Sequence, residues 1–165
     1  MKDRATRFEI RPMSAADIDR VMEIAASLPD APHWPRAVYM KALAPAAMPQ
    51  RICVVRAQTQ SGAIEGFAVA SFFPPQAELE SIAVAGDCQR QGVGRSLFDD
   101  LAKKMVSQGI GEIILEVRAS NLGALAFYRS LSFAEAGRRP RYYVDPIEDA
   151  VLMTFPMKRS GPPRG

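Results

Sequence analysis

The chain has 165 residues, of which 48% are hydrophobic and 24% are charged, and its formal net charge is +3. These values lie near the average of globular proteins and exclude a fibrous repeat or a wholly disordered chain. Lys and Arg residues are spread along the chain between acidic residues, so the positive charge does not predict a nucleic-acid surface.

The N-terminal part of the chain predicts one short strand and two helices. Residues 8–11 alternate in polarity like a strand. Ser14 and Asp17 have the spacing of a capping box, with Asp in place of Glu, and they predict a helix that runs to about Ser27. Pro35 is well placed to open a second, short helix.

Three β-rich runs follow, at residues 51–57, 64–73 and 77–85. A polar segment with a glycine separates the first two, which is typical of a hairpin. Apolar residues with helical periodicity then predict a helix over residues 93–108, and a further strand follows over residues 112–118. Because a helix connects the third run to this strand, the two strands are predicted to be parallel.

The last part of the chain predicts a helix over residues 121–131. Closing strands are predicted at residues 133–136 and 150–157, around a basic loop that carries two tyrosines. With no repeat and no linker in the sequence, we expect a single α/β domain over residues 1–158 and a disordered tail over residues 159–165.

The cysteines and the N-terminus indicate the compartment. Neither Cys53 nor Cys88 has the spacing of a metal site, so we expect two free thiols in a reducing environment and no bound metal. The N-terminus is charged where a signal peptide needs an apolar run, and no segment is long and apolar enough to span a membrane. The sequence therefore predicts a cytoplasmic protein with neither a membrane nor a nucleic acid as partner.

The segment from Ser81 to Arg95 is the most informative for function. A strand runs into a loop with several glycines, and this loop leads directly into the start of a helix. Glycines let the backbone approach a ligand closely, and the free amides and dipole at a helix N-terminus favour an anion. Arg90 and Arg95 add positive charge. The segment therefore predicts a phosphate-binding loop.

Two common phosphate-binding loops do not match this segment. Leu97 occupies the third glycine position of the dinucleotide fingerprint, and no GK[ST] sequence of a Walker A loop follows Gly92 or Gly94. The pattern Gln89-x-x-Gly92-x-Gly94 instead resembles the pyrophosphate loop of the GNAT superfamily of acetyltransferases, which holds the pyrophosphate of coenzyme A. A glycine-rich helix start that serves only tight packing is the alternative interpretation.

Later segments strengthen the resemblance. The segments Leu115–Asn121, Ala126–Phe133, Arg138–Tyr143 and Glu148–Met153 are similar to the bacterial ribosomal-protein N-terminal alanine acetyltransferases, the RimI-like family. Together the likeness covers about half of the chain. It implies a GNAT-type domain with a mixed central sheet of about six to seven strands, flanked by helices on both faces. It also implies acetyl-CoA as the cosubstrate and a protein N-terminus, of a ribosomal protein in that family, as the acceptor.

The resemblance implies roles for single residues as well. The catalytic glutamate of the family matches Glu116, and the tyrosine on its next helix matches Tyr128. Trp34, Tyr142 and Tyr143 are candidates for the acceptor side, and solvent-facing or core aromatics are the alternative interpretation of the two tyrosines. The residues that the resemblance places at the coenzyme are Ile82, Ala83, Val84, Gln89, Arg90, Gln91, Gly92, Val93, Gly94, Arg95 and Asn121.

The residues themselves fit these roles. Glu116 interrupts an otherwise apolar strand, so its carboxylate needs a partner, an opening or a function. As a base, directly or through a water, it can deprotonate an α-amino group, whose ordinary pKa is near ~8. An ion pair with Arg118, on the same face of the strand, is the structural alternative. Tyr128 can protonate the departing thiolate, or else it is an aromatic residue packed on the helix.

Several points stay open in the sequence. Glu80 lies in the strand before the loop, where other branches of the superfamily place a catalytic carboxylate, and it is a rival base or an acceptor-side residue. His33 either shapes the acceptor site or packs on Trp34 as a turn residue. Cys88 stands where the family often has an aromatic, and Ser132 where it commonly has a glycine, so Ser132 must adopt the turn geometry of that glycine.

Three functions remain in competition. The first is a protein N-terminal acetyltransferase. The second is a small-molecule amine acetyltransferase, because acceptor choice lies in the N-terminal half that resembles the family poorly. The third is a coenzyme A-binding regulatory module without catalysis. The sequence does not indicate whether the protein is a monomer or a homodimer.

Overall fold

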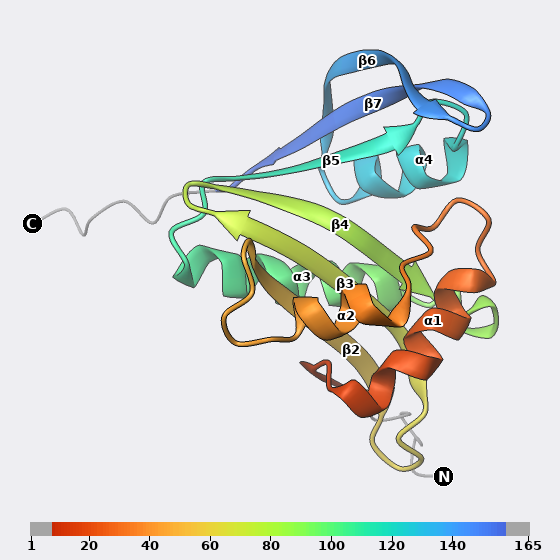
Figure 1. The fold of residues 1–165 in the computed structure, drawn as a ribbon, viewed down its shortest axis with the longest axis vertical. Helices are drawn as coiled ribbons and strands as arrows, with labels where there is room; N and C mark the ends of the chain where they lie inside the picture. The colour runs from red at the N-terminus through yellow and green to blue at the C-terminus, as the bar shows by residue number, and fades with distance from the viewer. Residues whose placement is uncertain (1–7, 158–165) are drawn as a thin grey trace, which may run out of the picture. The chain divides into compact units, whose positions relative to one another are not determined.

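A computed structural model describes residues 8–157 of the chain. It contains a seven-stranded sheet in the order β1-β2-β3-β4-β5-β7-β6 and four α-helices (Figure 1). The described residues divide into two compact units, residues 8–71 with 80–103 and residues 72–79 with 104–157. The predicted mixed α/β sheet is confirmed, whereas the tail predicted at residues 159–165 lies outside the described residues.

The first unit contains most of the N-terminal strands. β1 (Phe8–Pro12) pairs antiparallel with β2 (Gln50–Gln58), and β3 (Ile64–Phe73) and β4 (Gln76–Val84) continue the sheet. Along β4 the burial alternates with the two-residue period of a strand, so that Leu79, Ser81 and Ala83 point into the protein. The predicted strands of this part are confirmed to within a few residues.

Two helices cover one face of these strands. α1 (Ile18–Ala26) follows a 3-10 turn, and α2 (Arg36–Ala42) follows Pro35. The predicted capping box is present: the Asp17 carboxylate accepts a hydrogen bond of 2.8 Å from the Ser14 amide. It also forms an ion pair of 2.7 Å with Arg11 of β1. Asp17 thus joins the helix start to the edge strand.

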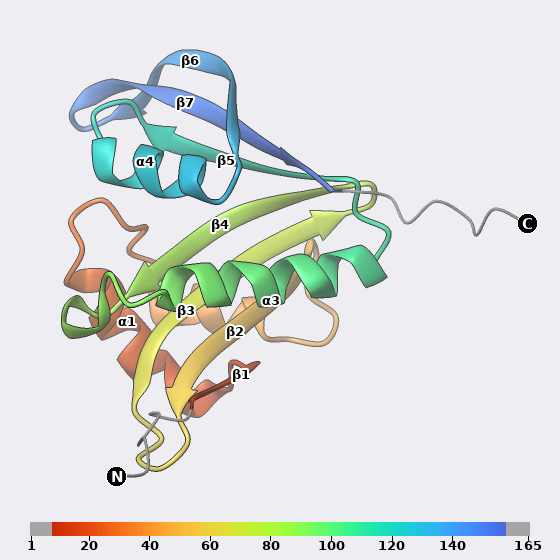
Figure 2. The same cartoon turned by 180° about the vertical axis from the view of Figure 1, so that it is seen from behind.

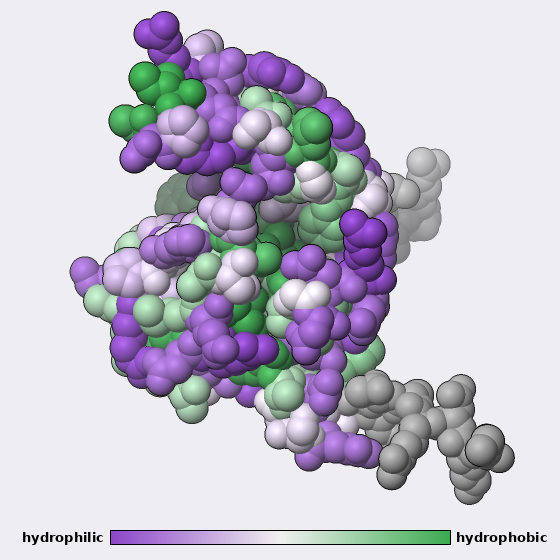
Figure 3. Space-filling model, turned by 90° about the vertical axis from the view of Figure 1, so that its right-hand side faces the viewer, coloured by the Kyte–Doolittle hydropathy of each residue, from purple (hydrophilic) through white to green (hydrophobic). Residues whose placement is uncertain are grey.

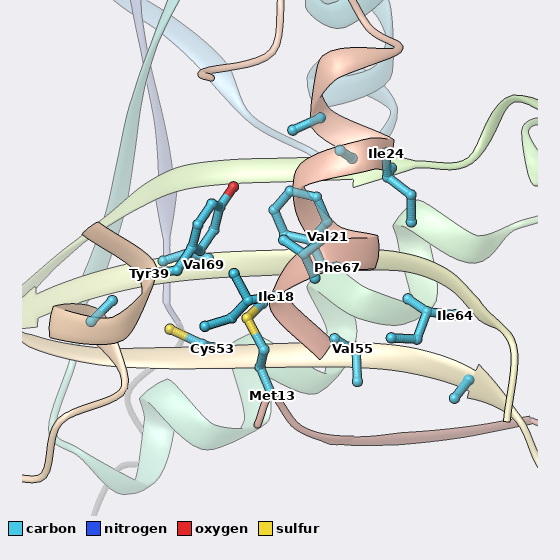
Figure 4. Close-up of a cluster of buried hydrophobic side chains, with 14 of the residues drawn as sticks. Met13, Ile18, Val21, Ile24, Tyr39, Cys53, Val55, Ile64, Phe67 and Val69 are labelled. Atoms are coloured by element: carbon cyan, nitrogen blue, oxygen red, sulfur yellow. The ribbon is translucent and has the colours of Figure 1, made fainter. Parts of the chain in front are cut away.

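The core of the first unit lies between these helices and the sheet, as Figure 4 shows. Ile18, Val21 and Ile24 of α1 are fully buried at helical spacing. They face Phe67 of β3, whose ring centroid lies 6.3 Å from that of Tyr39 in α2. Burial of this apolar stripe, rather than intrinsic helix propensity, provides most of the stability of such short helices.

α3 (Val93–Ser107) lies on the opposite face of the first unit's strands, as Figure 2 shows. A Cβ atom on Gly66 of β3 would lie 3.2 Å from side-chain atoms of both Val93 and Leu97, so the helix packs directly on this glycine. The helix ends as predicted before Gly109, whose φ of 76° suits a residue without a side chain. Helices therefore flank both faces of this part of the sheet.

The second unit carries the C-terminal strands and the last helix. Its elements are β5 (Glu112–Arg118), α4 (Leu122–Ser130), β6 (Ala134–Val144) and β7 (Ile147–Pro156). β5 pairs in parallel with residues 76–78 of β4, which confirms the predicted crossover, and antiparallel with β7. Val144 and Ile147, near the β6–β7 turn, are exposed apolar residues. Hydrophilic residues cover much of the molecular face drawn in Figure 3.

The predicted basic loop before the last strand is wrong. Residues 138–144 belong to β6, which pairs with β7 along most of its length. The pairing is interrupted between Arg139 and Tyr143, where three residues of β6 bulge out against one residue of β7. Such a bulge breaks the alternation of side chains, which is why the pattern resembles a loop. As predicted, Ser132 adopts a glycine-like conformation, with a φ of 80°.

Candidate active site

In the first unit, the predicted coenzyme residues of β4 lie past the end of its pairing with β5. The ladder between the two strands joins residues 76–78 to residues 112–114. Ile82, Ala83 and Val84 follow this ladder. The Val84 carbonyl already accepts a hydrogen bond of 3.2 Å from the Gln89 side chain, which ties the strand to the loop that follows it.

The predicted phosphate loop follows β4 and ends at α3. Arg90 and Gly92 have φ angles of 61° and 78°, in the left-handed region that disfavours most side chains. Glycine adopts this conformation without strain, whereas a residue such as Arg90 keeps it only where the surrounding structure fixes it, and such residues concentrate at functional sites. The Ser96 amide bonds to the Gly92 carbonyl at 3.0 Å, whereas the amides of residues 93–95 stand at the helix start, where no intrahelical acceptor exists. The loop therefore offers the donors that a diphosphate requires.

Glu80 and Trp34 are joined through Arg51. The Arg51 guanidinium donates to both oxygens of Glu80, at 2.8 and 3.2 Å, and both side chains are largely buried. The same guanidinium lies 6.0 Å from the centroid of the Trp34 ring. Both oxygens of Glu80 are thus engaged in a bidentate pair, which is a strong and specific arrangement.

The remaining predicted residues of the first unit make local contacts. A ring nitrogen of His33 lies 3.0 Å from the Leu28 carbonyl, and the aromatic neighbour of Trp34 is Tyr39, at 5.4 Å between ring centroids. Burial raises the pKa of the Cys88 thiol, and the nearby Asp87 carboxylate adds to the effect. His33 thus bonds to the backbone five residues earlier in the chain.

Glu116 is the centre of a polar cluster in the second unit. On β5 the side chains of Ile113, Leu115 and Val117 are buried, whereas Glu116 lies on the other face of the strand. Its carboxylate accepts a hydrogen bond from the Tyr142 hydroxyl, which raises the pKa of that phenol. It also lies 3.3 Å from the guanidinium of Arg139. The ion pair of Glu116 is therefore with Arg139, and Arg118 pairs with Glu148 at 3.3 Å.

The strand register explains how Arg139 reaches Glu116. Arg139 lies on β6, and β7 runs between it and β5. In register, Ala150 of β7 stands between Arg139 and Arg118, and Gly137 stands two residues before Arg139 on the same face. Glu116 itself is in register with Leu152 of β7, so the arginine side chain reaches it diagonally across β7. The bulge that follows Arg139 turns Tyr142 toward the same carboxylate.

Tyr128 and Tyr143 complete this cluster. Burial, together with the nearby Tyr143, raises the pKa of Tyr128 to about 12. The Tyr128 ring packs against Phe133 with centroids 5.8 Å apart. Burial and the Glu116 carboxylate raise the pKa of Tyr143, over whose ring the Arg118 guanidinium stacks at 4.2 Å. At neutral pH these phenols keep their protons, so they can donate hydrogen bonds or a proton.

Asn121 has a structural task that the sequence did not reveal. It is the N-cap of α4, and its side-chain oxygen accepts a hydrogen bond of 3.1 Å from the Ala124 amide. This bond uses the carbonyl end of the side chain and orients the amide nitrogen away from the cap. The amide nitrogen can still donate to a coenzyme, and the oxygen keeps a second lone pair that can accept.

The structure thus forms two groups of predicted residues, one in each unit. The first unit holds the strand end, the phosphate loop and the pair of Glu80 with Arg51; the second holds Glu116 and the three tyrosines 128, 142 and 143. Sequence reasoning missed Arg51 and Arg139, which hold the two carboxylates. The sequence did place Arg139 in the basic segment before the tyrosines. Its contact with Glu116 could not be predicted, because it depends on the register and the bulge of β6.

The described part of the chain also settles two structural points. Within residues 8–157 no group of three or more side chains is arranged to hold a metal ion. None of the helices in that range is long and apolar enough to span a membrane.

Comparison with known proteins identifies the family. The model of the acetyltransferase (GNAT) family matches residues 18–133. A [ribosomal protein bS18]-alanine N-acetyltransferase of Escherichia coli K12 is 44% identical over 101 residues, which cover 60% of this chain and 68% of that protein. The N-alpha-acetyltransferase RimI of Mycobacterium tuberculosis is 35% identical over 147 residues, which cover 86% of this chain and 87% of that protein.

A solved structure agrees with these relatives. The crystal structure of the ribosomal-protein-S18-alanine N-acetyltransferase from Escherichia coli superimposes with a TM-score of 0.79 and 31% sequence identity, and the match covers 96% of this chain and 99% of that one. The resemblance inferred from the loop and the later segments is confirmed. The chain belongs to the acetyltransferase (GNAT) family, and its activity is that of an N-acetyltransferase.

Proposed function

We propose that this protein transfers the acetyl group of acetyl-CoA to the N-terminal α-amino group of a protein. The observation that carries the proposal is the cluster in which the Glu116 carboxylate is held by Tyr142 and Arg139, next to the protonated Tyr128 and Tyr143. It combines a base with proton donors, as the reaction requires. The names of the Escherichia coli and Mycobacterium tuberculosis relatives support an α-amino group as the acceptor.

Binding of coenzyme A is proposed for the loop between β4 and α3. The amides at the start of α3, together with Arg90, are suited to hold the diphosphate of coenzyme A. Backbone groups of Ile82 to Val84, past the last pair with β5, are suited to the pantetheine arm. The loop fits a diphosphate because it offers several donors in a left-handed, glycine-containing turn.

The proton transfers are proposed for Glu116 and Tyr128. Glu116 takes a proton from the α-ammonium group, directly or through a water. Glu116 releases that proton to solvent, and the amine nitrogen forms a bond to the thioester carbonyl carbon. The nitrogen then gives up a second proton to Glu116, and the carbon–sulfur bond breaks to leave the amide. Tyr128 gives its proton to the departing thiolate, and its own proton is restored from solvent. The high pKa of Tyr128 keeps the phenol protonated until that step.

Glu116 is preferred over Glu80 as the base because of their partners. Both oxygens of Glu80 are bound by Arg51, and the exposed fraction of each side chain is below a fifth, at 17% and 18%. The partner of Glu116, Arg139, contacts it at 3.3 Å and is 58% exposed, so that water screens the attraction. The two carboxylates are about equally exposed, at 16% for Glu116 and 17% for Glu80, so the difference lies in the more weakly bound partner of Glu116.

The compartment and the acceptor protein are also proposals. Cys53 and Cys88 are both free thiols, which supports a reducing cytoplasm. There the natural acceptor would be the N-terminus of a ribosomal protein, as in the relatives. We propose one catalytic domain over residues 1–158.

The test is acetylation of short peptides. Purified protein is incubated with acetyl-CoA and peptides that begin with alanine, and the free thiol of coenzyme A is measured. We expect thiol release that depends on the peptide, and mass spectrometry should place the acetyl group on the α-nitrogen. A peptide with the same sequence and a blocked N-terminus is the matched control and should not react.

Other outcomes would select other functions. Turnover on polyamines, amino acids or aminoglycosides with none on peptides would favour a small-molecule acetyltransferase and overturn the proposed acceptor. Tight binding of coenzyme A without turnover on any amine would indicate a regulatory module.

A further inference from the structure

Ser96 links the phosphate loop to the sheet. It lies in the first turn of α3, where its hydroxyl donates to the Val93 carbonyl at 2.8 Å. The same hydroxyl accepts a hydrogen bond of 2.7 Å from the guanidinium of Arg56 on β2. A charge-assisted bond thus holds the first turn of α3, where the loop ends.

Arg56 is itself held rigidly. Its guanidinium pairs with Glu65 of β3 at 2.9 Å, and each of the two side chains is 11% exposed. The second oxygen of Glu65 accepts a bond of 3.1 Å from Gln58, and the ring of Phe8 lies 3.5 Å from the guanidinium carbon. A buried ion pair of this kind is weak evidence for stability, because desolvation offsets the attraction. The pair does, however, fix the position of the guanidinium that donates to the Ser96 hydroxyl.

The backbone of β3 fixes the loop at both of its ends. The Glu65 carbonyl accepts a bond of 2.8 Å from the amide of Ala85, where β4 ends and the loop begins. A Cβ atom on Gly66 would lie 2.7 Å from the Ala83 carbonyl and 3.2 Å from Val93, so both the strand before the loop and the helix after it touch this glycine. The loop is therefore clamped to residues 65 and 66.

We propose that Arg56, acting through Ser96, is a positioning residue for the diphosphate of the coenzyme. The amides at the start of α3 must be held to within a fraction of an ångström to bind it well, and supporting contacts of this kind provide that precision. Neither residue belongs to the loop, and neither is proposed to touch the acceptor. The inference rests on the proposed function, because it requires the loop to hold coenzyme A.

The test compares two serines of the same helix. Ser96→Ala removes the acceptor of the Arg56 bond, and Ser107→Ala, at the other end of α3, removes a similar bond to the carbonyl three residues earlier, at 2.7 Å. We expect Ser96→Ala to raise both KM for acetyl-CoA and Kd for coenzyme A by about three- to tenfold. The kcat at saturation and KM for the peptide should stay unchanged, and Ser107→Ala should leave all four values as in the unaltered protein.

A conservative variant and thermal unfolding separate positioning from general stability. Ser96→Thr keeps the hydroxyl and should restore the affinity for coenzyme A. The inference is overturned if Ser96→Ala binds coenzyme A as the unaltered protein does, or if kcat and both KM values change together in step with a lower Tm. If the unaltered protein itself shows no binding of coenzyme A by calorimetry, the proposed function fails and this inference fails with it.

Discussion

At the scale of single residues, the chain uses two carboxylates in different ways. Both oxygens of Glu80 bind a largely buried arginine. Glu116 instead forms an ion pair with an exposed arginine and accepts a hydrogen bond from a tyrosine hydroxyl. The first arrangement fixes a geometry. The second leaves a carboxylate that can accept a proton from a substrate.

Replacing each carboxylate by its amide should separate these tasks. Glu116→Gln should lower kcat by about a hundredfold, because general base catalysis contributes on this order, and leave stability nearly unchanged. Glu80→Gln should instead lower the free energy of unfolding by about 1–3 kcal/mol, since it leaves a largely buried arginine partly unsatisfied. Thiol-release kinetics and urea unfolding measure the two effects, and a larger loss of kcat in Glu80→Gln would reverse the assignment.

The Tyr128 hydroxyl gives a second prediction at this scale. Tyr128→Phe keeps the ring packing but removes the proton donor, and we expect kcat to fall by about a hundredfold with KM for acetyl-CoA unchanged. Because the pKa of Tyr128 is raised to about 12, the unaltered enzyme should not lose this acid as the pH rises toward 10, the ordinary value for tyrosine. A pH profile of kcat provides the measurement. Equal turnover in the variant would remove Tyr128 from the mechanism.

At the scale of elements, an ion pair fastens the first helix to the edge strand. Arg11 and the Ser14 amide together lower the pKa of Asp17 from 3.8 to about 2. A carboxylate with a lowered pKa in the folded state contributes stability above its unfolded pKa. That contribution disappears as the pH falls toward the folded value.

Asp17→Asn should therefore destabilise the protein at neutral pH by about 2 kcal/mol, in line with a pKa change of nearly two units in a buried side chain. The destabilisation relative to the unaltered protein should shrink as the pH is lowered from about 4 toward about 2. Urea unfolding of both proteins across this range is the measurement. A difference that stays constant with pH would show that the lost packing, and not the charge, is responsible.

The bulge of β6 acts at the same scale. It interrupts the pairing after Arg139 and directs Tyr142 toward Glu116 on a strand that is not its neighbour. The backbone around it is fixed, because the Arg141 amide donates to the Asp149 carboxylate at 3.0 Å. A regular strand would place these side chains by strict alternation, so the cluster depends on the irregularity.

At the scale of the whole molecule, coenzyme binding should stabilise the folded state. A ligand at a hundred times its Kd adds about 2.7 kcal/mol to the free energy of unfolding when it binds the folded state alone. We expect coenzyme A to raise Tm accordingly in thermal unfolding. Pantetheine, which lacks the diphosphate, should have little effect at the same concentration. If the two ligands stabilise equally, the loop before α3 does not hold the diphosphate.

Much of the fold was predictable because its signals are local. The capping box, the alternating strands and the helical stripe of α3 are written in neighbouring residues, and the structure confirms each of them. The family could be inferred for the same reason, since the phosphate loop is a contiguous pattern. The start of β6 was predicted, but its continuation past residue 136 was missed because the bulge hides the two-residue period.

By itself, the sequence determined the α/β class, the order of the elements, the donor loop and the identity of Glu116 and Tyr128 as candidates. Only the tertiary structure decided which partners these residues have: Arg139 and Tyr142 for Glu116, Arg51 for Glu80, and Arg56 for Ser96. The pattern of neighbouring residues reflects their backbone preferences and their burial, which are properties of short stretches of the chain. Partners come from strand register and bulges, which bring together residues far apart in the chain.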